Sequence, residues 1–292
     1  MTIYIVTTGS YCENITDELP PLKTLVTESV NCSVRRVGRF IQLALIGAGR
    51  ASQQLSKNAA VYFTSGSGDM AVTVDVLNAI YRQGEAPRPL SFINTVSNAS
   101  CFYIAQSLQL NGASNFVSSR YFPMESALRL ALLALKSGEQ QAALVGAVDV
   151  AVTPLADHRK RMGVDENATI AEGSHWLQLV SDATNRDVLA TLDDVQPFKD
   201  RAALSAYLSE LPFNDTDYLA LGQFVAPNEV SQWLAETDLP QFKFRDGVGE
   251  FKSQAGLAFC QFVEQGVGRL IYLNRDVVGR YMLVVVSCGA GD

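Results

Sequence analysis

The stretch Asn115–Asp149 most constrains the fold, because its pattern predicts a strand, a sharp turn, a helix and a second strand. Asn115–Ser119 has the composition of a β-strand, and residues 120–123 (RYFP) predict the turn. Ala142–Val148 is apolar throughout, as in a fully buried strand. Between them, apolar side chains recur at helical spacing, at Met124, Ala127, Leu128, Ala131, Leu132 and Leu135.

Such a unit places the turn at a helix N-terminus, where backbone N–H groups stabilise developing negative charge, and turns of this kind often hold a nucleophile. The turn residue here is Tyr121, a phenol whose ordinary pKa is about 10. Glu125 follows in the first helical turn, where a carboxylate suits the positive end of the helix. The architecture therefore predicts a nucleophile site that contains a poor nucleophile.

Composition narrows the classes of function. The 292 residues have a net charge of -7, which argues against nucleic-acid binding through phosphate neutralisation. No apolar run approaches the roughly 18 residues of a membrane span, and the N-terminus lacks a secretory pattern. The five cysteines are scattered without a CxxC pair, so neither a zinc site nor a disulfide framework is indicated. We therefore expect a cytoplasmic protein without a metal or other cofactor.

Strands and helices alternate along the chain, which predicts an α/β fold with buried sheets. Further strands are expected at Thr2–Thr7, Ala59–Thr64, Glu172–Val180, Thr191–Gln196, Tyr218–Leu221 and Tyr281–Ser287. Further helices are expected at Arg35–Leu55, 70–82, Asn98–Leu110, Ala202–Glu210, Asn228–Ala235 and Gln254–Gly266. Gly47 and Gly49 in the first of these helices indicate close packing against a neighbour. The charged segment Pro154–Glu166 is expected to be a loop.

Other candidate sites are weaker. Gly66–Ala71 fits a variant dinucleotide-binding pattern after a strand, although a tight strand-to-helix turn is the simpler explanation. His158 lies in a charged run and is expected to be solvated, whereas His175 lies inside a strand and is expected to be structural. Cys101 and Cys260 are expected to pack in the core. None of these residues is accompanied by a partner that would indicate catalysis.

Seven motifs in order resemble those of the β-ketoacyl synthases, which have the thiolase-like fold. They lie at Arg35–Ala51, Thr64–Asp69, Asn94–Leu110, Ser137–Asp149, Glu172-Gly173, Lys252–Gly256 and Ser287–Gly291. The resemblance implies a five-layered αβαβα fold with two pseudo-duplicated halves, residues 1–181 and 182–292, divided in the polar run Ser181–Asp187. The second half is expected to be shortened, with the family's last strand absent.

The resemblance also assigns the catalytic positions. Tyr121 replaces the nucleophilic cysteine, Leu221 replaces the first histidine with one residue of uncertainty, and Leu257 replaces the second histidine. Only Lys252 of the polar catalytic set is retained. Cys288 takes the place of a phenylalanine that gates the family's active site. Condensation requires a thiolate and two imidazoles, so these replacements imply that the condensing chemistry is lost.

The function implied by the resemblance is that of a non-catalytic chain length factor. It would form a heterodimer with a catalytic ketosynthase in type II polyketide or fatty-acid-like biosynthesis and meet acyl carrier protein through that complex. A narrower resemblance is to small ketosynthase-like partners in bacterial arylpolyene synthesis. The edge-to-edge partner interface would comprise Gly112, Asn115, Phe116, Val117, Ser118 and Ser119. The residues lining the acyl tunnel would be Met70, Thr73, Leu77 and Tyr81.

Three alternatives stay open on the sequence. The first is a divergent acyl-transfer enzyme with a rearranged site, and the second is a scaffold that only stabilises its partner. The third is a nucleotide-binding protein that uses Gly66–Ala71.

Overall fold

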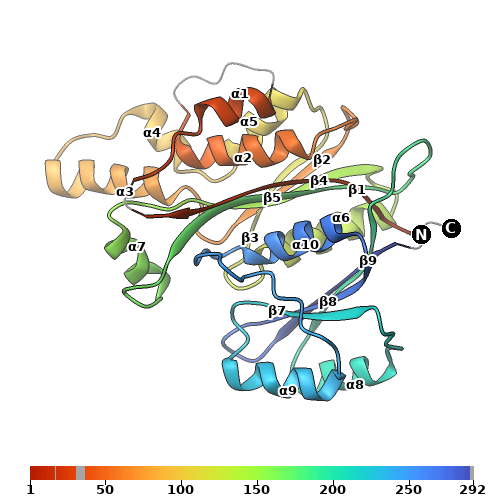
Figure 1. The fold of residues 1–292 in the computed structure, drawn as a ribbon. Coiled ribbons are helices and arrows are strands. Elements are labelled where there is room, and N and C mark those ends of the chain that lie inside the picture. Colours follow the sequence, from red (N-terminus) through yellow and green to blue (C-terminus); the bar gives the residue numbers. More distant parts are fainter. Residues whose placement is uncertain (17, 31–36, 290–292) are drawn as a thin grey trace.

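The computed structural model describes residues 1–16, 18–30 and 37–289, and it has five layers (Figure 1). Two half-sheets enclose a central layer of helices, and further helices cover the outer face of each half-sheet. The elements from the N-terminus to residue 180 are β1 (Tyr4–Ile15), α1 (Lys23–Ser29), α2 (Arg39–Arg50), β2 (Ala60–Ser65), α3 (Met70–Asn78), a π-helical turn η1 (Ala79–Gln83), α4 (Pro89–Asn94), α5 (Ala99–Leu108), β3 (Ser114–Ser118), α6 (Pro123–Lys136), β4 (Ala142–Asp149), α7 (Leu155–Met162) and β5 (Ile170–Val180).

The remaining elements repeat this arrangement more briefly. They are β6 (Ala190–Phe198), α8 (Arg201–Glu210), β7 (Asp217–Leu221), α9 (Pro227–Thr237), α10 (Gln254–Gln265), β8 (Gly268–Arg275) and β9 (Tyr281–Cys288). Helices α6 and α10 form the central layer, α1, α2 and α5 cover the first half-sheet, and α8 and α9 cover the second (Figure 1). The predicted α/β fold of the thiolase-like type is confirmed.

The two half-sheets have the same strand order and the same strand directions. The first runs β3-β2-β4-β5-β1 and the second runs β7-β8-β9-β6. In both, the inner neighbours are antiparallel and the outer pairs are parallel. Two residue pairs, Tyr4 with Thr191 and Ile5 with Ala190, join the halves through β1 and β6. This correspondence is what a duplicated unit would produce.

The second half-sheet differs from the first only at its outer edge. Within the described residues, the counterpart of β3 is reduced to one parallel bridge between Leu219 and Gln241. The expectation that the family's last strand is missing is therefore wrong, because β9 occupies the place that β5 has in the first half. The shortening affects the outermost strand, which immediately precedes the central helix α10.

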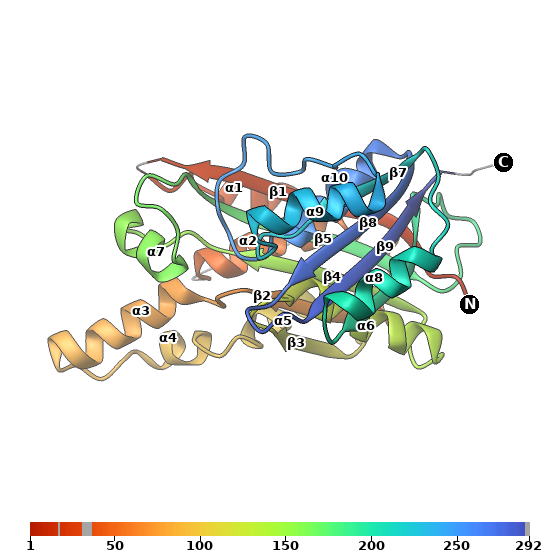
Figure 2. The ribbon, with the colours of Figure 1, turned by 90° about the horizontal axis from the view of Figure 1, so that it is seen from below.

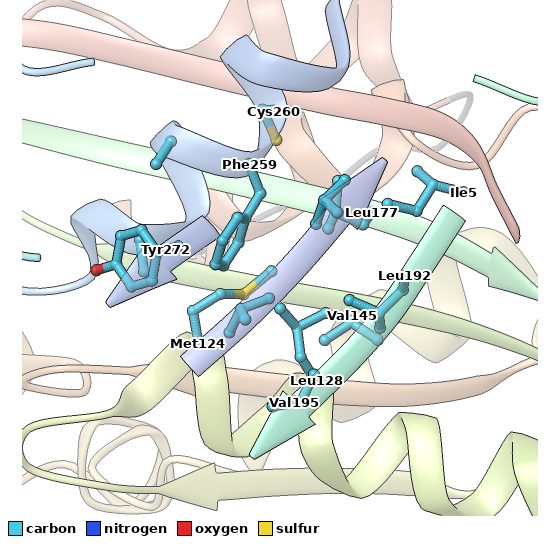
Figure 3. Packing of buried hydrophobic residues seen from close by; sticks show 14 of the residues in the cluster. Ile5, Met124, Leu128, Val145, Leu177, Leu192, Val195, Phe259, Cys260 and Tyr272 are labelled. Carbon is cyan, nitrogen blue, oxygen red and sulfur yellow. The ribbon is translucent and has the colours of Figure 1, made fainter. Parts of the chain in front are cut away.

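The central core explains why α6 and α10 are apolar on so much of their surface. Figure 3 shows Met124 and Leu128 of α6 and Phe259 of α10 packed between side chains of both half-sheets, including Val145 and Val195. Since the central helices face a sheet on either side, each buries two faces rather than one. The outer cores lie between each half-sheet and its covering helices.

Two glycines make room for the largest side chain of the first half-sheet. Trp176 of β5 is fully buried and stacks on Phe63, with ring centroids 5.3 Å apart. A methyl group on Gly146 would lie 1.9 Å from Cδ2 of Trp176, and one on Gly47 would lie 2.4 Å from Cδ1. Gly49 similarly packs against the carbonyl oxygen of Ser29. The predicted close packing at Gly47 and Gly49 is confirmed.

Several predicted boundaries need correction. Pro154–Glu166 contains α7 rather than only a loop, and α1, α4 and β8 were not expected. Strand β1 continues to Ile15 because its polar residues pair along β5. The predicted helix Arg35–Leu55 is observed as α2, and its motif residues Arg35-Arg36 lie outside the described residues. The other predicted strands and helices are found within a few residues of their expected ends.

Candidate functional site

The predicted elbow is confirmed as the connection between β3 and α6. Strand β3 ends at Ser118 and α6 begins at Pro123, and the Ser119 hydroxyl accepts a hydrogen bond from the Phe122 N–H at 3.3 Å. Tyr121 lies half-buried at the turn, with its ring edge-to-face against Phe224 at 5.3 Å between centroids. The Arg120 guanidinium lies 5.5 Å from the centre of the same ring. The phenol ring is therefore held by packing on both sides.

A residue of the second half-sheet fixes the backbone of this elbow. Asn274, near the end of β8, donates its side-chain N–H groups to the carbonyl oxygen of Tyr121 at 3.2 Å and to Oε1 of Glu125 at 2.7 Å. Its side-chain oxygen accepts from the Arg275 N–H at 2.9 Å, which sets the orientation of the amide. The elbow is thus tied to the other half of the molecule through one buried amide.

Glu125 is located in the first turn of α6, as expected, but it is fully buried rather than available to solvent. Burial raises its pKa to about 7, although the hydrogen bond from Asn274 opposes that rise. Burial and the nearby Glu125 charge also raise the pKa of the Tyr272 phenol. The elbow therefore contains an acid that is readily protonated near neutral pH, a feature that the sequence pattern did not indicate.

Leu221 is not the residue of β7 that faces the elbow. Its side chain belongs to the outer core beneath α8 and α9, whereas Ala220 belongs to the central core. Because side chains alternate along a strand, the next position to face inward is Gly222. A methyl group there would lie 2.4 Å from Cγ of Asn274 and 2.6 Å from the Tyr272 hydroxyl, so no side chain fits. Leu221 therefore faces away from the elbow, and Gly222, the next residue in the chain, faces it.

Leu257 and Lys252 lie near the start of α10 but in different surroundings. Leu257 is buried in the central core that also contains Met124 of the elbow helix. Lys252 is half-buried and packs over the turn after β2, since a methyl group on Gly66 would lie 2.2 Å from its Cβ. The structure brings Tyr121 close to Asn274 and Phe224.

Asp149 connects three elements beside Lys252. One carboxylate oxygen accepts from the Ser253 N–H and hydroxyl at 2.7 and 2.5 Å, and the other accepts from the Ser65 hydroxyl and Gly66 N–H, both at 3.0 Å. Four donors around one buried carboxylate join the ends of β2 and β4 to the start of α10. This arrangement is structural, because each carboxylate oxygen of Asp149 already accepts two hydrogen bonds from these elements.

The nucleotide-binding alternative is not supported by the turn after β2. The N–H groups of Ser67 and Gly68 donate to the Ser65 hydroxyl at 3.2 and 2.8 Å, and Gly66 donates to Asp149. The Asp69 carboxylate accepts from the Val72 N–H at 3.2 Å and caps α3. The donors that would bind a pyrophosphate are therefore occupied, and the simpler explanation of a tight strand-to-helix turn fits.

The two histidines and the cysteines Cys101 and Cys260 make none of the contacts described above for Tyr121. His158 is buried on α7, so its expected solvation is wrong; burial followed by the nearby Arg161 charge lowers its pKa to about 4. His175 is structural, with Nδ1 2.8 Å from the Ser10 hydroxyl, and burial lowers its pKa to about 3. Cys101 and Cys260 are buried in the outer and central cores, as expected.

Cys288 does not gate the elbow. It pairs with Gly268 and Ala190 at the end of β9 that is farthest from Asn274, and part of the Ser287–Gly291 motif lies outside the described residues. The segment of the second half-sheet that reaches the elbow is instead the end of β8. The missed signal was the apolar run Leu270–Leu273 before Asn274, which is typical of a buried strand.

The predicted partner strand β3 is the first edge of the sheet. It pairs with β2 only, and within the described part of the chain its other edge has no strand neighbour. Phe116 packs edge-to-face on Phe63 and Val117 packs against the central core, so both side chains serve this chain's own interior. Gly112 faces the carbonyl oxygen of Ala59 rather than the free edge. What β3 presents outward is its backbone.

The predicted tunnel helix α3 projects from the body together with α4 (Figure 2). Met70 packs against the first outer core and Thr73 donates its hydroxyl to the Asp69 carbonyl at 2.8 Å, so both lie at the base of the projection. Leu77 and Tyr81 are exposed, and Tyr81 is 81% exposed. Two of the four residues predicted to line a tunnel are thus exposed on this projection.

An apolar surface, which we name the arm surface, continues from α3 to α5. Between α4 and α5 it contains a groove of about 420 Å³ lined chiefly by Phe92, Ile93, Val96, Phe102 and Tyr103. Large apolar side chains on a monomer surface generally mark an interaction site. The exposed members of the arm surface are Leu77, Ile80, Tyr81, Leu90, Phe92, Ile93, Val96 and Phe102.

The described residues contain no group of three or more metal-binding side chains, and no helix among them is long and apolar enough to cross a membrane.

Comparison with known proteins agrees with this geometry. Residues 32–162 match the family model of the β-ketoacyl synthase N-terminal domain. A comparison with curated proteins found no match. The chain is similar to the structure described as the ishigamide ketosynthase/chain length factor, with a TM-score of 0.78, 14% identity, and coverage of 99% of this chain and 100% of the other.

Two further structures are similar over comparable lengths. One is a type II polyketide synthase acyl-carrier protein in complex with its ketosynthase bound to the hexaketide, with a TM-score of 0.74, 11% identity and 99% coverage of both chains. The other is a β-ketoacyl synthase from Burkholderia phymatum, with a TM-score of 0.75, 10% identity, and coverage of 99% and 100%. The chain therefore has a ketosynthase-like fold. The resemblance to β-ketoacyl synthases predicted from its sequence is confirmed.

Proposed function

We propose that this chain is a non-catalytic ketosynthase-like subunit, comparable to a chain length factor, that pairs with a catalytic ketosynthase. The observation that carries the proposal is the composition of the elbow. By the resemblance to β-ketoacyl synthases, Tyr121 takes the nucleophile position and Leu257 the second histidine position. The first histidine position falls at Leu221 within one residue, and the inward-facing residue there is Gly222. These three positions offer a phenol, a hydrogen atom and an isobutyl group.

Those groups cannot perform a decarboxylative condensation. The reaction needs a thiolate to accept the acyl group and donors that stabilise the developing negative charge on a thioester carbonyl. A phenol is a much weaker nucleophile than a thiolate, and the side chain of leucine has no polar atom. No imidazole could be restored at residue 222 by substitution alone, because Asn274 and Tyr272 occupy the space. Restoring any one of the three residues would therefore not restore the condensation reaction.

The arm surface and the free edge of β3 support the pairing. The arm surface projects from the body with α3 and α4 (Figure 2), and β3 lies at the edge of the sheet. A catalytic ketosynthase that added a strand to β3 would pair with its unpaired backbone groups. It would also cover the apolar groove between α4 and α5. One partner would thus pair with the backbone of β3 and also cover the apolar side chains of the groove.

In this complex Met70, Thr73, Leu77 and Tyr81 would form one wall of the acyl tunnel. Acyl carrier protein would deliver substrates to the catalytic subunit, and the product would be a polyketide or a fatty-acid-like chain. The structure of an acyl-carrier protein with its ketosynthase, to which this chain is similar, is consistent with that route. A role in arylpolyene synthesis is a narrower form of the same proposal.

Co-expression with the ketosynthase encoded nearest to it tests the pairing directly. We expect the two chains to co-purify as a stable complex that condenses acyl carrier protein thioesters, whereas this chain alone is inactive. Turnover by the isolated chain that disappears in Tyr121→Phe would instead establish a divergent enzyme. The absence of a complex with any co-encoded ketosynthase would contradict the proposal.

The tunnel assignment has a separate test. Leu77→Trp or Thr73→Trp adds bulk along the proposed tunnel wall, so the complex is expected to make shorter products, which mass spectrometry measures. Val267→Trp, at an exposed position after α10, is the control and should leave product length unchanged. If all three variants give the original products while deletion of this chain makes the ketosynthase insoluble, the chain is only a stabilising scaffold.

A further inference from the structure

The buried contact between Glu125 and Asn274 has a property that pairing with a ketosynthase does not explain. Oε1 of Glu125 accepts a hydrogen bond from Asn274 at 2.7 Å, whereas Oε2 meets no donor at hydrogen-bonding geometry among the described residues. The Tyr272 hydroxyl is nevertheless near enough to oppose the rise in the pKa of Glu125. The whole side chain is inaccessible to solvent. A neutral carboxylic acid tolerates this surrounding far better than a carboxylate, because an unpaired buried charge costs much more than an unpaired polar atom.

The groups that surround Glu125 do not supply a compensating positive charge. Tyr272 and Asn274 face it from β8, Gly222 approaches from the end of β7, and α10 presents uncharged residues such as Phe259 to the same core. Arg245 is near enough to Tyr272 to lower its pKa, but it is not among the groups that shift the pKa of Glu125. The Arg120 guanidinium packs on the ring of Tyr121.

The partial positive charge at the N-terminus of α6 is the remaining influence that stabilises the ionised form of Glu125. Its effect near the first turn is modest and would favour the ionised acid. Burial outweighs it, because the pKa of Glu125 is raised to about 7 rather than lowered.

We propose that Glu125 and Asn274 form a proton-dependent latch, which holds the elbow closed while Glu125 is protonated and releases it when the proton is lost. The same Asn274 amide binds the Tyr121 carbonyl oxygen, so a displacement that hydrates Glu125 also frees the elbow backbone. The elbow is the natural place for water to enter, because Ser118 and Arg120 on either side of Ser119 are exposed. Since β3 ends at Ser118, the released segment adjoins the proposed partner edge.

The sign of the pH dependence follows from the raised pKa. The closed state holds the proton up to a pH of about 7, whereas an open, hydrated Glu125 would lose it near its ordinary value of about 4.3 to 4.5. The opening constant therefore increases as the pH rises from about 4.4 to about 7, and it is nearly constant at higher pH. Between pH 5 and pH 7 the opening constant should rise roughly fortyfold.

Hydrogen exchange of the purified chain tests the latch without any partner. Protection of the backbone amides of Phe122 and Ser126 is measured from pH 5 to pH 8.5 and corrected for the intrinsic exchange rate. The wild type should lose protection roughly fortyfold between pH 5 and pH 7 and only about twofold more above pH 7. Glu125→Gln, which cannot ionise, should show little change, and Glu139→Gln, at an exposed position beyond α6, should behave as the wild type.

Equal pH dependence in the wild type and in Glu125→Gln would overturn the latch. If Glu125→Gln does not fold, carbon NMR of the glutamate carboxyl groups in the wild type decides the question. One carboxyl that titrates near pH 7 supports the proposal, and titration of every glutamate near its ordinary value contradicts it. Either result leaves the pairing with a ketosynthase to its own test.

Discussion

Phe92→Asp is expected to abolish co-purification with the catalytic ketosynthase while leaving this chain folded. Phe92 is 58% exposed and lines the groove between α4 and α5 with Ile93 and Phe102. A partner that covers the groove would remove water from the new carboxylate without supplying a countercharge, which is costly. Loss of an apolar anchor of this kind should weaken binding at least about a hundredfold, or about 3 kcal/mol.

Titration calorimetry or an affinity pull-down measures that loss, and thermal unfolding of the isolated variant shows whether the chain itself is intact. Val267→Asp is the matched control, since Val267 is also exposed, at 60%. It precedes Gly268, which pairs with Cys288 at the end of β9, and this end of the strand lies far from α4 (Figure 1). Equal binding by both variants would remove the arm surface from the interface. Equal loss in both would indicate a general effect of added charge.

Gly146→Ala is expected to prevent stable folding, although it adds a single methyl group. Gly146 lies in the middle of β4, and the added carbon would lie within 2.4 Å of three carbons of the Trp176 indole. The indole cannot withdraw, because it stacks on Phe63 and packs against Gly47 of α2 on its other side. Overpacking commonly costs 1–3 kcal/mol, and we expect more than about 3 kcal/mol here because both neighbours are backbone or ring atoms.

Soluble yield and the midpoint of urea unfolding measure the effect. Gly38→Ala is the control, because the nearest atoms to a methyl group there lie at ordinary contact distances of 3.4 and 3.5 Å. Combining Gly146→Ala with Trp176→Leu should recover part of the stability, since the smaller side chain vacates the contact. A Gly146→Ala variant as stable as the wild type would show that β4 and β5 can separate locally.

The order of elements was predictable from periodicity, since a buried strand or a two-faced helix needs a long run of apolar residues. Segments with mixed composition were less predictable. The charged residues of α7 concealed a helix whose inner face buries His158, and the polar residues of β1 concealed strand pairing that depends on distant β5. In both segments contacts remote in sequence outweigh local composition.

The candidate site was predictable only in part. Its position at Tyr121 follows from the local strand–turn–helix pattern. The direction of Leu221 does not, because a shift of one residue exchanges the two faces of a strand and the sequence alone did not fix that register. Asn274 was missed because it comes from the other half of the chain, and no local pattern links it to an elbow more than a hundred residues away. The protonation of Glu125 depends on burial, which periodicity does not measure.

The sheet's other edge has a consequence for the size of any assembly. Strand β7 would be free to pair, but the segment before α10 covers it: the Leu219 N–H donates to the Pro240 carbonyl, and its carbonyl accepts from the Phe242 N–H, both at 2.9 Å. Among the described strands only β3 then keeps an open edge. Pairing of two chains through their β3 edges uses up the open edge of each, so the assembly closes at two subunits instead of growing into a fibre.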